Sequence, residues 1–280
     1  MNKKLLIIGL GLIGGSYALK LKEKGYEVYS LDNDPKTLAY AIENKIIKDG
    51  KLNPEKDYIS SFDYVIFALY PKTLLEFVKK YHDYFKKDCI ISDVSGIKEY
   101  FIDEVQELLP QCEFIGAHPM AGREILGIYN AKSDLFTKAN YIITPTNKNT
   151  ERGIEFAKQI GEDLDVYRIA YLSPAEHDKM IAYLSQLTHT IAISLMTCQD
   201  TTHLASYSGD SFQDLTRIAK INENMWSELF ILNKDKLVEE MDIFINDFVK
   251  LRESIASGDT EKLKELMKLS SLRRDYFVKK

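Results

Sequence analysis

The sequence predicts an α/β fold, in which a doubly wound parallel sheet is followed by an all-helical domain. Three observations predict it. Short apolar runs alternate with helical patterns in the first half of the chain, as in sheets covered by helices on both faces. A glycine-rich turn, Gly9-Leu10-Gly11-Leu12-Ile13-Gly14, joins the first apolar run to the first helical pattern. After Tyr171 only helical patterns follow.

The predicted strands are short, and most are apolar throughout, which is typical of strands buried on both faces. They cover residues 4–9, 28–32, 64–69, 89–94, 114–117, 141–144 and 165–169. The helices predicted between them cover residues 13–24, 35–44, 72–85, 99–109 and 150–164. Because strands and helices alternate, we expect the strands to run parallel.

The helical part begins at a strong start signal, Ser173-Pro174-Ala175-Glu176. Serine suits the cap, proline the first turn, and glutamate the position three residues after the cap. The predicted helices cover residues 174–197, 213–219, 222–233, 234–257 and 260–277. We therefore place the domain boundary between residues 1–171 and 172–280.

The first of these helices is apolar over much of its surface. Ile181, Leu184, Leu187, Ile191 and Leu195 recur at helical spacing, and a helix of this kind must be buried. Either the rest of the same chain covers it, as for an ordinary central helix, or a second copy does. We favour a homodimer, because a one-chain bundle of this size offers little to cover it.

Length and charge limit the classes of protein. A chain of 280 residues suits two domains. The net charge of -5 argues against nucleic acid or an anionic membrane as a partner. No apolar run approaches the ~20 residues of a membrane span. The run at residues 5–8 breaks at once into the glycine turn, so we expect a strand, not a signal peptide, and a cytoplasmic protein.

The glycine turn has the context of a dinucleotide site, since it follows a strand and opens a helix. Gly9 allows the tight turn, Gly11 the approach of the pyrophosphate, and Gly14 close helix packing. Asp32, 18 residues after Gly14, ends the second strand, where a carboxylate binds ribose hydroxyls and favours NAD over NADP. The alternative is a purely structural turn. The predicted cofactor-binding residues are Gly9, Gly11, Leu12, Ile13, Gly14 and Asp32.

His118 is the candidate base. It ends a strand at the sheet edge where ligands bind, and Pro119 and Gly122 constrain the loop that follows. A histidine near its ordinary pKa accepts a hydroxyl proton at neutral pH. A strand-end histidine is more often structural, but the small-residue motif around this one favours chemistry.

His177 and His189 lie 12 residues apart on one predicted helix, roughly on the same side. They are too far apart to share a metal, and no carboxylate completes a ligand set, so we predict no metal site. His189 is expected to face a polar substrate. Arg217, a partly buried arginine in an apolar turn, needs an anion, either Asp214 or a substrate carboxylate.

Taken together, these motifs resemble the prephenate dehydrogenase family, which includes arogenate dehydrogenases. The matching segments follow family order along nearly the whole chain. They are residues 9–14, Asp93-Val94-Ser95-Gly96-Ile97-Lys98, residues 116–122, His177-Asp178-Lys179, Ser185-Gln186-Leu187-Thr188-His189, and residues 214–219 with Trp226.

The resemblance implies a Rossmann-like NAD domain at residues 1–171 and a helical substrate and dimerisation domain at residues 172–280. It implies oxidative decarboxylation of prephenate to 4-hydroxyphenylpyruvate in tyrosine biosynthesis, without a metal. His118 would take the proton of the ring hydroxyl, and inhibition by L-tyrosine at the active site is compatible with it. The implied substrate-binding residues are Arg217, His189, His177, Glu124 and Trp226; core packing is the alternative for Trp226, and Arg123 either binds a carboxylate or pairs with Glu124.

Two departures from the family pattern stand out. The family commonly has glycine then serine where this chain has Ser95-Gly96, and that serine assists the catalytic histidine. We expect Ser95 to do so from a shifted position. Asp210 adds a negative charge near an anionic substrate. The chain also lacks a chorismate mutase segment and a C-terminal regulatory domain, which predicts a monofunctional enzyme.

Three other functions compete with this one. An arogenate dehydrogenase would share the mechanism and differ in the side chain of its substrate. A reductase of similar plan would need a lysine on a helical segment, and no lysine has a comparable setting. A non-catalytic NAD sensor would leave His118 and Arg217 without a chemical role.

Overall fold

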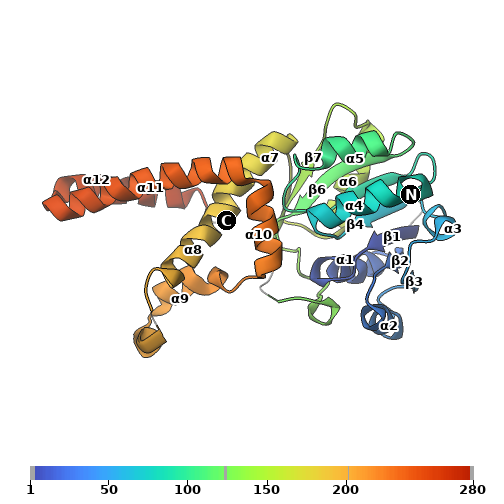
Figure 1. The fold of residues 1–280 in the computed structure, drawn as a ribbon, viewed down its shortest axis with the longest axis horizontal. Helices are drawn as coiled ribbons and strands as arrows, with labels where there is room; N and C mark the ends of the chain where they lie inside the picture. Colours follow the sequence, from blue (N-terminus) through green and yellow to red (C-terminus); the bar gives the residue numbers. More distant parts are fainter. Residues whose placement is uncertain (1–3, 123–124, 201, 278–280) are drawn as a thin grey trace. The chain divides into compact units, whose positions relative to one another are not determined.

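The computed structural model describes residues 4–122, 125–200 and 202–277 (Figure 1). The chain forms two compact units, Met1–Asn233 and Lys234–Lys280. The first unit holds the sheet and the helices up to α10, and the second holds α11 and α12. All of the residues considered below for the active site belong to the first unit.

An eight-stranded sheet in the order β3-β2-β1-β4-β5-β6-β7-β8 forms the centre of the first unit. Its order steps outward in both directions from β1, as in a doubly wound sheet. The strands are β1 (Lys4–Ile8), β2 (Glu27–Leu31), β3 (Asp49–Lys51), β4 (Tyr64–Phe67), β5 (Ile90–Asp93), β6 (Glu113–Pro119), β7 (Asn140–Thr144) and β8 (Arg168–Tyr171).

The prediction of a wholly parallel sheet is wrong at one junction. The pairs from β3 to β6 are parallel, but β7 runs antiparallel to β6, with His118 opposite Ile142. Among the residues described between β6 and β7, the chain forms a short 3₁₀ turn, Ile128–Asn130, and no crossover helix of the kind that parallel neighbours need. β8 is parallel to β7. The prediction also missed β3, a three-residue edge strand without an apolar run.

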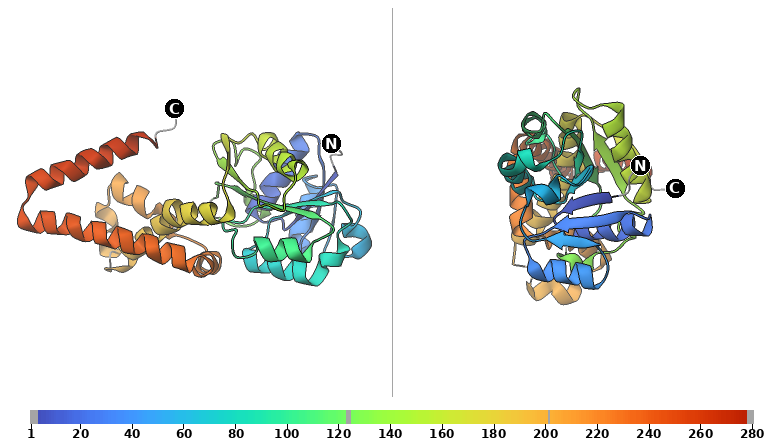
Figure 2. Two further views of the ribbon diagram at one scale, coloured as in Figure 1. Left: turned by 90° about the horizontal axis from the view of Figure 1, so that it is seen from above. Right: turned by 90° about the vertical axis from the view of Figure 1, so that its right-hand side faces the viewer.

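Helices cover both faces of the sheet (Figure 2). Leu5 and Ile7 of β1 pack in one apolar core with α1, α2 and α6, whereas Leu6 and Ile8 pack in the other with α3, α4 and α5. This alternation along one strand is the signature of a sheet buried on both faces. The helices are α1 (Leu12–Glu23), α2 (Pro35–Glu43), α3 (Lys56–Ile59), α4 (Pro71–Tyr81), α5 (Ile102–Leu108) and α6 (Glu151–Asp163).

The helical part of the first unit begins as predicted, at a capping box between Ser173 and Glu176. The predicted helix at 174–197 is not uniformly α-helical, because a π-helical segment, Ala182–Leu187, separates its two halves. It is also not fully buried within the chain, since Leu184 is 42% exposed. The helices are α7 (Pro174–Ile181), α8 (Thr188–Thr197), α9 (Asp210–Thr216) and α10 (Glu223–Leu232), with 3₁₀ turns at Thr202–Tyr207 and Arg217–Ala219.

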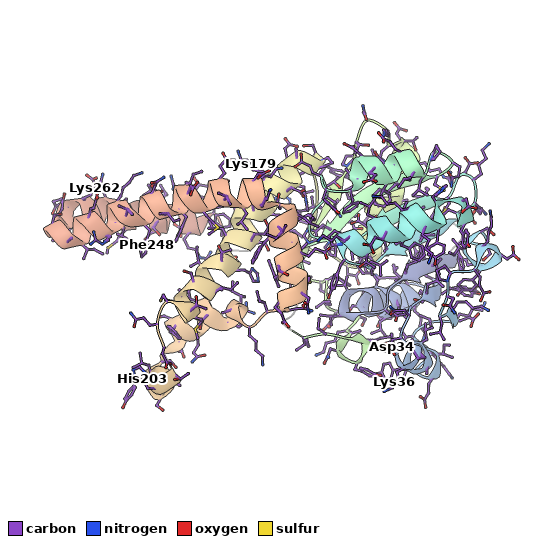
Figure 3. The ribbon with its side chains drawn as sticks, in the orientation of Figure 1. Asp34, Lys36, Lys179, His203, Phe248 and Lys262 are labelled. Carbon is purple, nitrogen blue, oxygen red and sulfur yellow. The ribbon has the colours of Figure 1, made fainter. Side chains whose placement is uncertain are left out.

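The second unit is a pair of helices, α11 (Lys234–Ser257) and α12 (Thr260–Asp275). Gly258 has a φ of +73° and Asp259 caps α12, so the turn chemistry matches the predicted boundary. Phe248, drawn in Figure 3, and Ile243 are more than half exposed. Among the described helices, none has the length and apolar character that a membrane span requires.

Candidate active site

The candidate site lies at the carboxyl edge of the sheet. The glycine turn follows β1, the Ser95-Gly96 turn follows β5, and His118 is the second-last residue of β6. Ligands bind at this edge in doubly wound sheets, because the helix N-termini and connecting loops meet there. The fold therefore brings three of the predicted segments to one edge.

Protein atoms leave no space for a side chain at the first and last glycines of the turn, whereas the space beside the middle glycine is empty. Gly9 has a φ of +95°, and a Cβ there would lie 2.6 Å from the carbonyl oxygen of Ala68. A Cβ on Gly14 would lie 2.0 Å from the carbonyl oxygen of Gly9, whereas a Cβ on Gly11 would meet nothing within 4 Å. This arrangement fits the cradle that a pyrophosphate needs.

The residues around the turn also fit a dinucleotide. α1 begins at Leu12 with no acidic side chain in its first turn, so its N-terminal N–H groups are available to an anion. The Asp32 carboxylate accepts hydrogen bonds from the backbone N–H groups of Leu10 (2.7 Å) and Asp34 (2.9 Å). The bond from Leu10 holds the end of β2 against the glycine turn. Asp34 caps α2, accepting from the backbone of Lys36.

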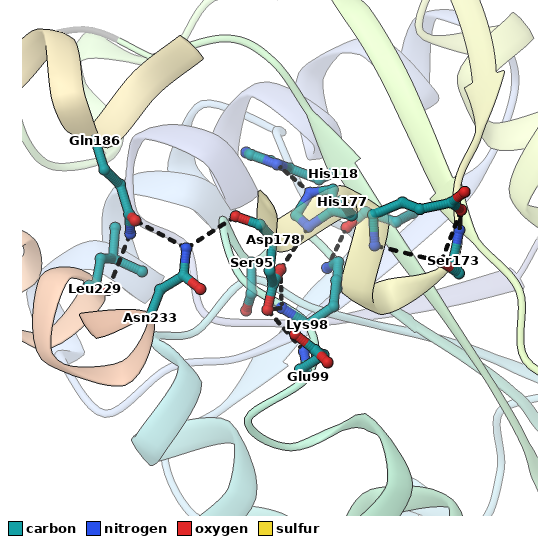
Figure 4. Close-up of polar contacts among 12 residues, drawn as sticks. Ser95, Lys98, Glu99, His118, Ser173, His177, Asp178, Gln186, Leu229 and Asn233 are labelled. Carbon is teal, nitrogen blue, oxygen red and sulfur yellow. Dashed lines mark hydrogen bonds and ion pairs between the residues drawn. The ribbon is translucent and has the colours of Figure 1, made fainter. Parts of the chain in front are cut away.

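His118 pairs with a second histidine, and Figure 4 shows both in the centre of the polar cluster. Its Nδ1 lies 2.9 Å from Nε2 of His177, which comes from α7. His177 is fully buried, and His118 is partly buried. The structure thus joins two residues that the sequence analysis kept apart, one as a base and the other as a substrate ligand.

Asp178 holds the other side of the His177 ring. One of its carboxylate oxygens lies 2.7 Å from His177 Nδ1. The same carboxylate accepts hydrogen bonds from the backbone N–H groups of Lys98 (2.8 Å) and Glu99 (2.9 Å). These bonds engage the backbone where the sequence predicted a helix from residue 99, and α5 begins only at Ile102.

A buried ion pair lies beneath the histidines. Lys98 and Asp93 are 0% and 1% exposed, and the Lys98 ammonium donates to the Asp93 carboxylate and to the carbonyl of Ala117 (2.7 Å). The Asp93 carboxylate also accepts from the N–H groups of Ala117 (3.1 Å) and Ser95 (2.8 Å). A buried charge is tolerated when it is paired and hydrogen-bonded in this way. The pair thus fixes the end of β5 against β6, directly before His118.

The surroundings keep both histidines neutral. Burial lowers the pKa of His118 well below its usual range, and His177 and the Lys98 ammonium lower it further. Burial, followed by the field of Lys98, also holds the pKa of His177 well below its usual range. Burial lowers the pKa of Lys98, while Asp93 opposes that shift. At neutral pH the His118 ring is therefore unprotonated and has a lone pair that can accept a proton.

The Ser95-Gly96 turn places glycine, not serine, beside the His118 ring. A Cβ on Gly96 would lie 3.8 Å from both Nε2 and Cε1 of His118. The Ser95 hydroxyl donates to the carbonyl of Leu69 at 3.4 Å. Within the described ranges no hydrogen bond joins Ser95 to His118, so a direct role of Ser95 in assisting the base stays a prediction.

His189 and Trp226 come together as a stacked pair, with ring centroids 3.7 Å apart. His189 Nδ1 donates to the carbonyl of Ser185 at 2.8 Å, which orients the ring. The π-helical segment lies between His177 and His189 and holds more residues in each turn than an α-helix does. Twelve residues would otherwise make about 3.3 turns, so the segment brings the two positions closer to one face.

Arg217 differs from its prediction. It begins a 3₁₀ turn after α9, and its side chain is exposed rather than partly buried. The turn packs against α8, the helix that carries His189. The turn follows α9, a helix of seven residues with no buried side chain among its described residues. The predicted residues Arg123 and Glu124 lie outside the described residues.

Sequence reasoning gave no role to Asp93, Lys98 or Asp178, although all three stand in motifs it recognised. The missed signal was a charged residue next to an apolar run, as in Ile90-Ile91-Ser92-Asp93. Asn233 was missed as well: its side-chain amide donates to the carbonyl of Asp178 (2.9 Å) and to Gln186 (2.8 Å). The hydrogen bond to Asp178 links the end of α10 to α7 (Figure 4).

Two family models cover most of the chain. Residues 17–169 match the nucleotide-binding domain of prephenate dehydrogenase, and residues 173–269 match its dimerisation domain. Both matches run in the order in which the two parts occur here.

Individual relatives agree with the family match. The chain is 29% identical to the prephenate dehydrogenase of Bacillus subtilis, over 98% of this chain and 76% of the relative. It is 29% identical to the cyclohexadienyl dehydrogenase of Zymomonas mobilis, over 97% of this chain and 95% of that one. Prephenate dehydrogenase from Aquifex aeolicus, solved with hydroxyphenyl propionate and NAD+, superposes with a TM-score of 0.89 at 28% identity, over 98% of each chain.

Proposed function

The chain belongs to the prephenate dehydrogenase family, and we propose that it catalyses the NAD-dependent oxidative decarboxylation of prephenate to 4-hydroxyphenylpyruvate, a step of L-tyrosine biosynthesis. One observation carries the proposal. A neutral His118, bonded to a buried His177 at 2.9 Å, stands at the same sheet edge as a glycine turn suited to a dinucleotide. A base and a hydride acceptor side by side are what the oxidation of an alcohol requires.

The proposed chemistry uses His118 as the general base. NAD, when bound, supplies the acceptor for the hydride. His118 takes the proton of the ring hydroxyl while the hydride leaves the same carbon, and a ketone results. The ring double bonds connect the ketone with the quaternary carbon that carries a carboxylate. Carbon dioxide then departs, and the electrons of the broken C–C bond pass through the ring to the ketone oxygen. The ring becomes aromatic, and the oxygen takes back the proton held by His118 to give the phenol.

Cofactor binding is proposed at the glycine turn. Gly9, Gly11 and Gly14 form the cradle, and the N-terminus of α1 at Leu12 and Ile13 binds the pyrophosphate. Asp32 accepts from the ribose hydroxyls with the lone pairs that Leu10 and Asp34 leave free. A carboxylate at this place repels a 2′-phosphate, so NAD is preferred over NADP.

Substrate binding is proposed on the helical side. His189, stacked on Trp226, holds the pyruvyl side chain, and Arg217, on the turn packed against α8, binds one substrate carboxylate. Ser95 is retained as a candidate for assisting the base. Arogenate carries an amino group in place of the keto group, and the Zymomonas relative is named for the broader cyclohexadienyl class.

We further assign residues 1–171 to nucleotide binding and residues 172–280 to substrate binding and dimerisation. The family models, which end at residue 169 and resume at residue 173, support that boundary. Leu184 and Met196 of the predicted interface helix remain 42% and 37% exposed within one chain. A second copy covering them would give a homodimer, which sedimentation of the purified protein would detect.

The test is an assay of the purified chain with NAD and prephenate, following the absorbance of reduced nicotinamide. Arogenate and NADP are run in parallel. Formation of 4-hydroxyphenylpyruvate with NAD supports the proposal. Turnover with arogenate alone would keep the mechanism and change the substrate. Tight NAD binding without turnover of either compound would overturn the proposal and favour a sensor.

A further inference from the structure

We propose that Asp178 and His177 are positioning residues that set the tautomer of His118, so that its Nε2 carries the lone pair that takes the substrate proton. The inference deepens the function proposed above, because it gives His177 a role toward the base and not toward the substrate. It follows from the direction in which each hydrogen bond of the chain Asp178–His177–His118 must run.

The direction is set at the carboxylate end. Asp178 accepts from the backbone N–H groups of Lys98 and Glu99, and an ionised carboxylate has no hydrogen to give. His177 Nδ1, 2.7 Å from this carboxylate, must therefore carry its proton and donate. Because burial and Lys98 keep the pKa of His177 low, the ring is neutral and its Nε2 is bare.

The second bond then has only one direction. The bare Nε2 of His177 accepts, so His118 Nδ1, 2.9 Å away, must be the donor. A neutral imidazole carries one N–H, which leaves Nε2 of His118 as its lone-pair nitrogen. That nitrogen faces Gly96, where a Cβ would lie 3.8 Å away. The glycine leaves space for a hydroxyl beside the basic nitrogen.

The same chain stabilises the product of proton transfer. When Nε2 takes the proton, His118 becomes an imidazolium whose Nδ1–H still donates to His177. The charged groups around it are the Lys98 ammonium, paired with Asp93, and the Asp178 carboxylate behind His177. Lys98 opposes the new positive charge, while Asp178 favours it through His177. Among the described residues, His177 is the hydrogen-bond partner that the structure gives His118.

The first test reads the tautomers directly and needs neither substrate nor cofactor. Protein labelled with ¹⁵N in its five histidines is studied by NMR at pH 7, with His118→Asn and His177→Gln used for assignment. The proposal expects a protonated Nδ1 and a bare Nε2 on both His118 and His177. A protonated Nε2 on His118 would overturn it, whatever the enzyme's activity.

The second test uses Asp178→Asn to reverse the direction of the hydrogen bonds between residues 178, 177 and 118. The asparagine amide can donate to His177 Nδ1, which moves the His177 proton to Nε2 and forces His118 into the wrong tautomer. We expect kcat to fall by between about 10²-fold, the lower contribution of a general base, and about 10⁴-fold, the loss for a comparable tautomer reversal in serine proteases. KM should change by less than about threefold. Asp178→Asn protein that is folded, binds NAD and retains kcat within threefold would overturn the proposal.

A matched pair at position 177 separates positioning from packing and from substrate binding. His177→Gln keeps an oxygen that can accept from His118 Nδ1, whereas His177→Leu removes the acceptor. We expect Gln to retain at least tenfold more kcat than Leu, at equal melting temperature, and to shift the acidic limb of the pH–rate profile. An equal loss of kcat in both variants would overturn the proposal and leave His177 a structural residue. A rise in KM at unchanged kcat would overturn it and leave His177 a substrate ligand.

The two tests also separate the relay from the proposed function. If the tautomers are as proposed but the protein turns over neither prephenate nor arogenate, the positioning of His118 by His177 and Asp178 would be supported and the proposed function rejected. If the protein turns over substrate but His118 carries its proton on Nε2 before substrate binds, the proposed function would be supported and the proposed positioning by His177 and Asp178 rejected.

Discussion

The glycine turn and the histidine cluster lie at the same sheet edge but are built in different ways. The turn consists of backbone atoms from residues 9–14, and its shape depends on missing side chains. The cluster takes side chains from the β5–α5 connection, from β6 and from α7, up to 80 residues apart along the chain. The proposed pyrophosphate cradle is thus contained in one local segment, whereas the surroundings of His118 depend on the packing of three segments.

The largest effect is expected from removing the base itself. His118→Asn should lower kcat by about 10²–10⁴-fold, the usual contribution of a general base, without weakening NAD binding at the separate turn. Steady-state kinetics and NAD titration check this. His82→Asn, at an exposed histidine, is the control and should behave like the parent. Full activity in His118→Asn would refute the assignment of the base.

Two glycine substitutions should separate the fold of the turn from its function. The Cβ of Gly14→Ala would meet the Gly9 carbonyl oxygen at 2.0 Å, so we expect a loss of about 2–3 kcal/mol in unfolding free energy. Gly11→Ala has open space and should leave stability within about 0.5 kcal/mol. Its methyl group should still weaken NAD binding at least about tenfold, because it fills the cradle. Denaturant unfolding and calorimetric titration measure the two effects, and equal stabilities of the two variants would contradict this account.

Acidification should lower the free energy of unfolding through the histidine cluster rather than through the glycine turn. The folded pKa values of His118 and His177 lie below the unfolded value near 6.5, so the unfolded chain binds more protons as the pH falls. The stability they contribute is complete above that value and is lost below it, by about 1.4 kcal/mol per pH unit for each histidine. Urea unfolding between pH 7 and pH 5 would show the slope. The double variant His118→Asn/His177→Gln should be flatter, and an unchanged slope would argue against neutral buried histidines.

The smallest effect is expected from restoring a hydroxyl beside the base. Gly96→Ser has room for its Cβ at 3.8 Å from His118, so the fold should tolerate it. A hydroxyl that donates to the bare Nε2 stabilises the neutral imidazole and competes with the substrate hydroxyl. We expect a fall in kcat/KM of less than about tenfold and a lower pKa on the acidic limb of its pH profile. A rise in that pKa would mean that Nε2 is not the free nitrogen.

The sheet shows where local patterns were sufficient for prediction. Seven of its strands overlap predicted strands, most of which are apolar runs, although β8 (Arg168–Tyr171) lies three residues beyond the predicted start at residue 165. The capping box at Ser173 marked the start of α7 within one residue. β3 escaped because Asp49-Gly50-Lys51 has no apolar side chain to bury. β7 was predicted as a strand, but its antiparallel direction was not, because strand direction depends on the path of the preceding connection, which has no periodic signal.

The site divides in the same way. The sequence by itself determined the glycine turn, the Asp34 cap and the candidacy of His118, since each depends on residues close along the chain. Only the tertiary structure decided that His177 pairs with His118 and that Asp178 holds His177. It also decided that Gly96, not Ser95, faces the base. These contacts join separate elements, and their geometry depends on how a helix packs against the end of a sheet, which no single segment encodes.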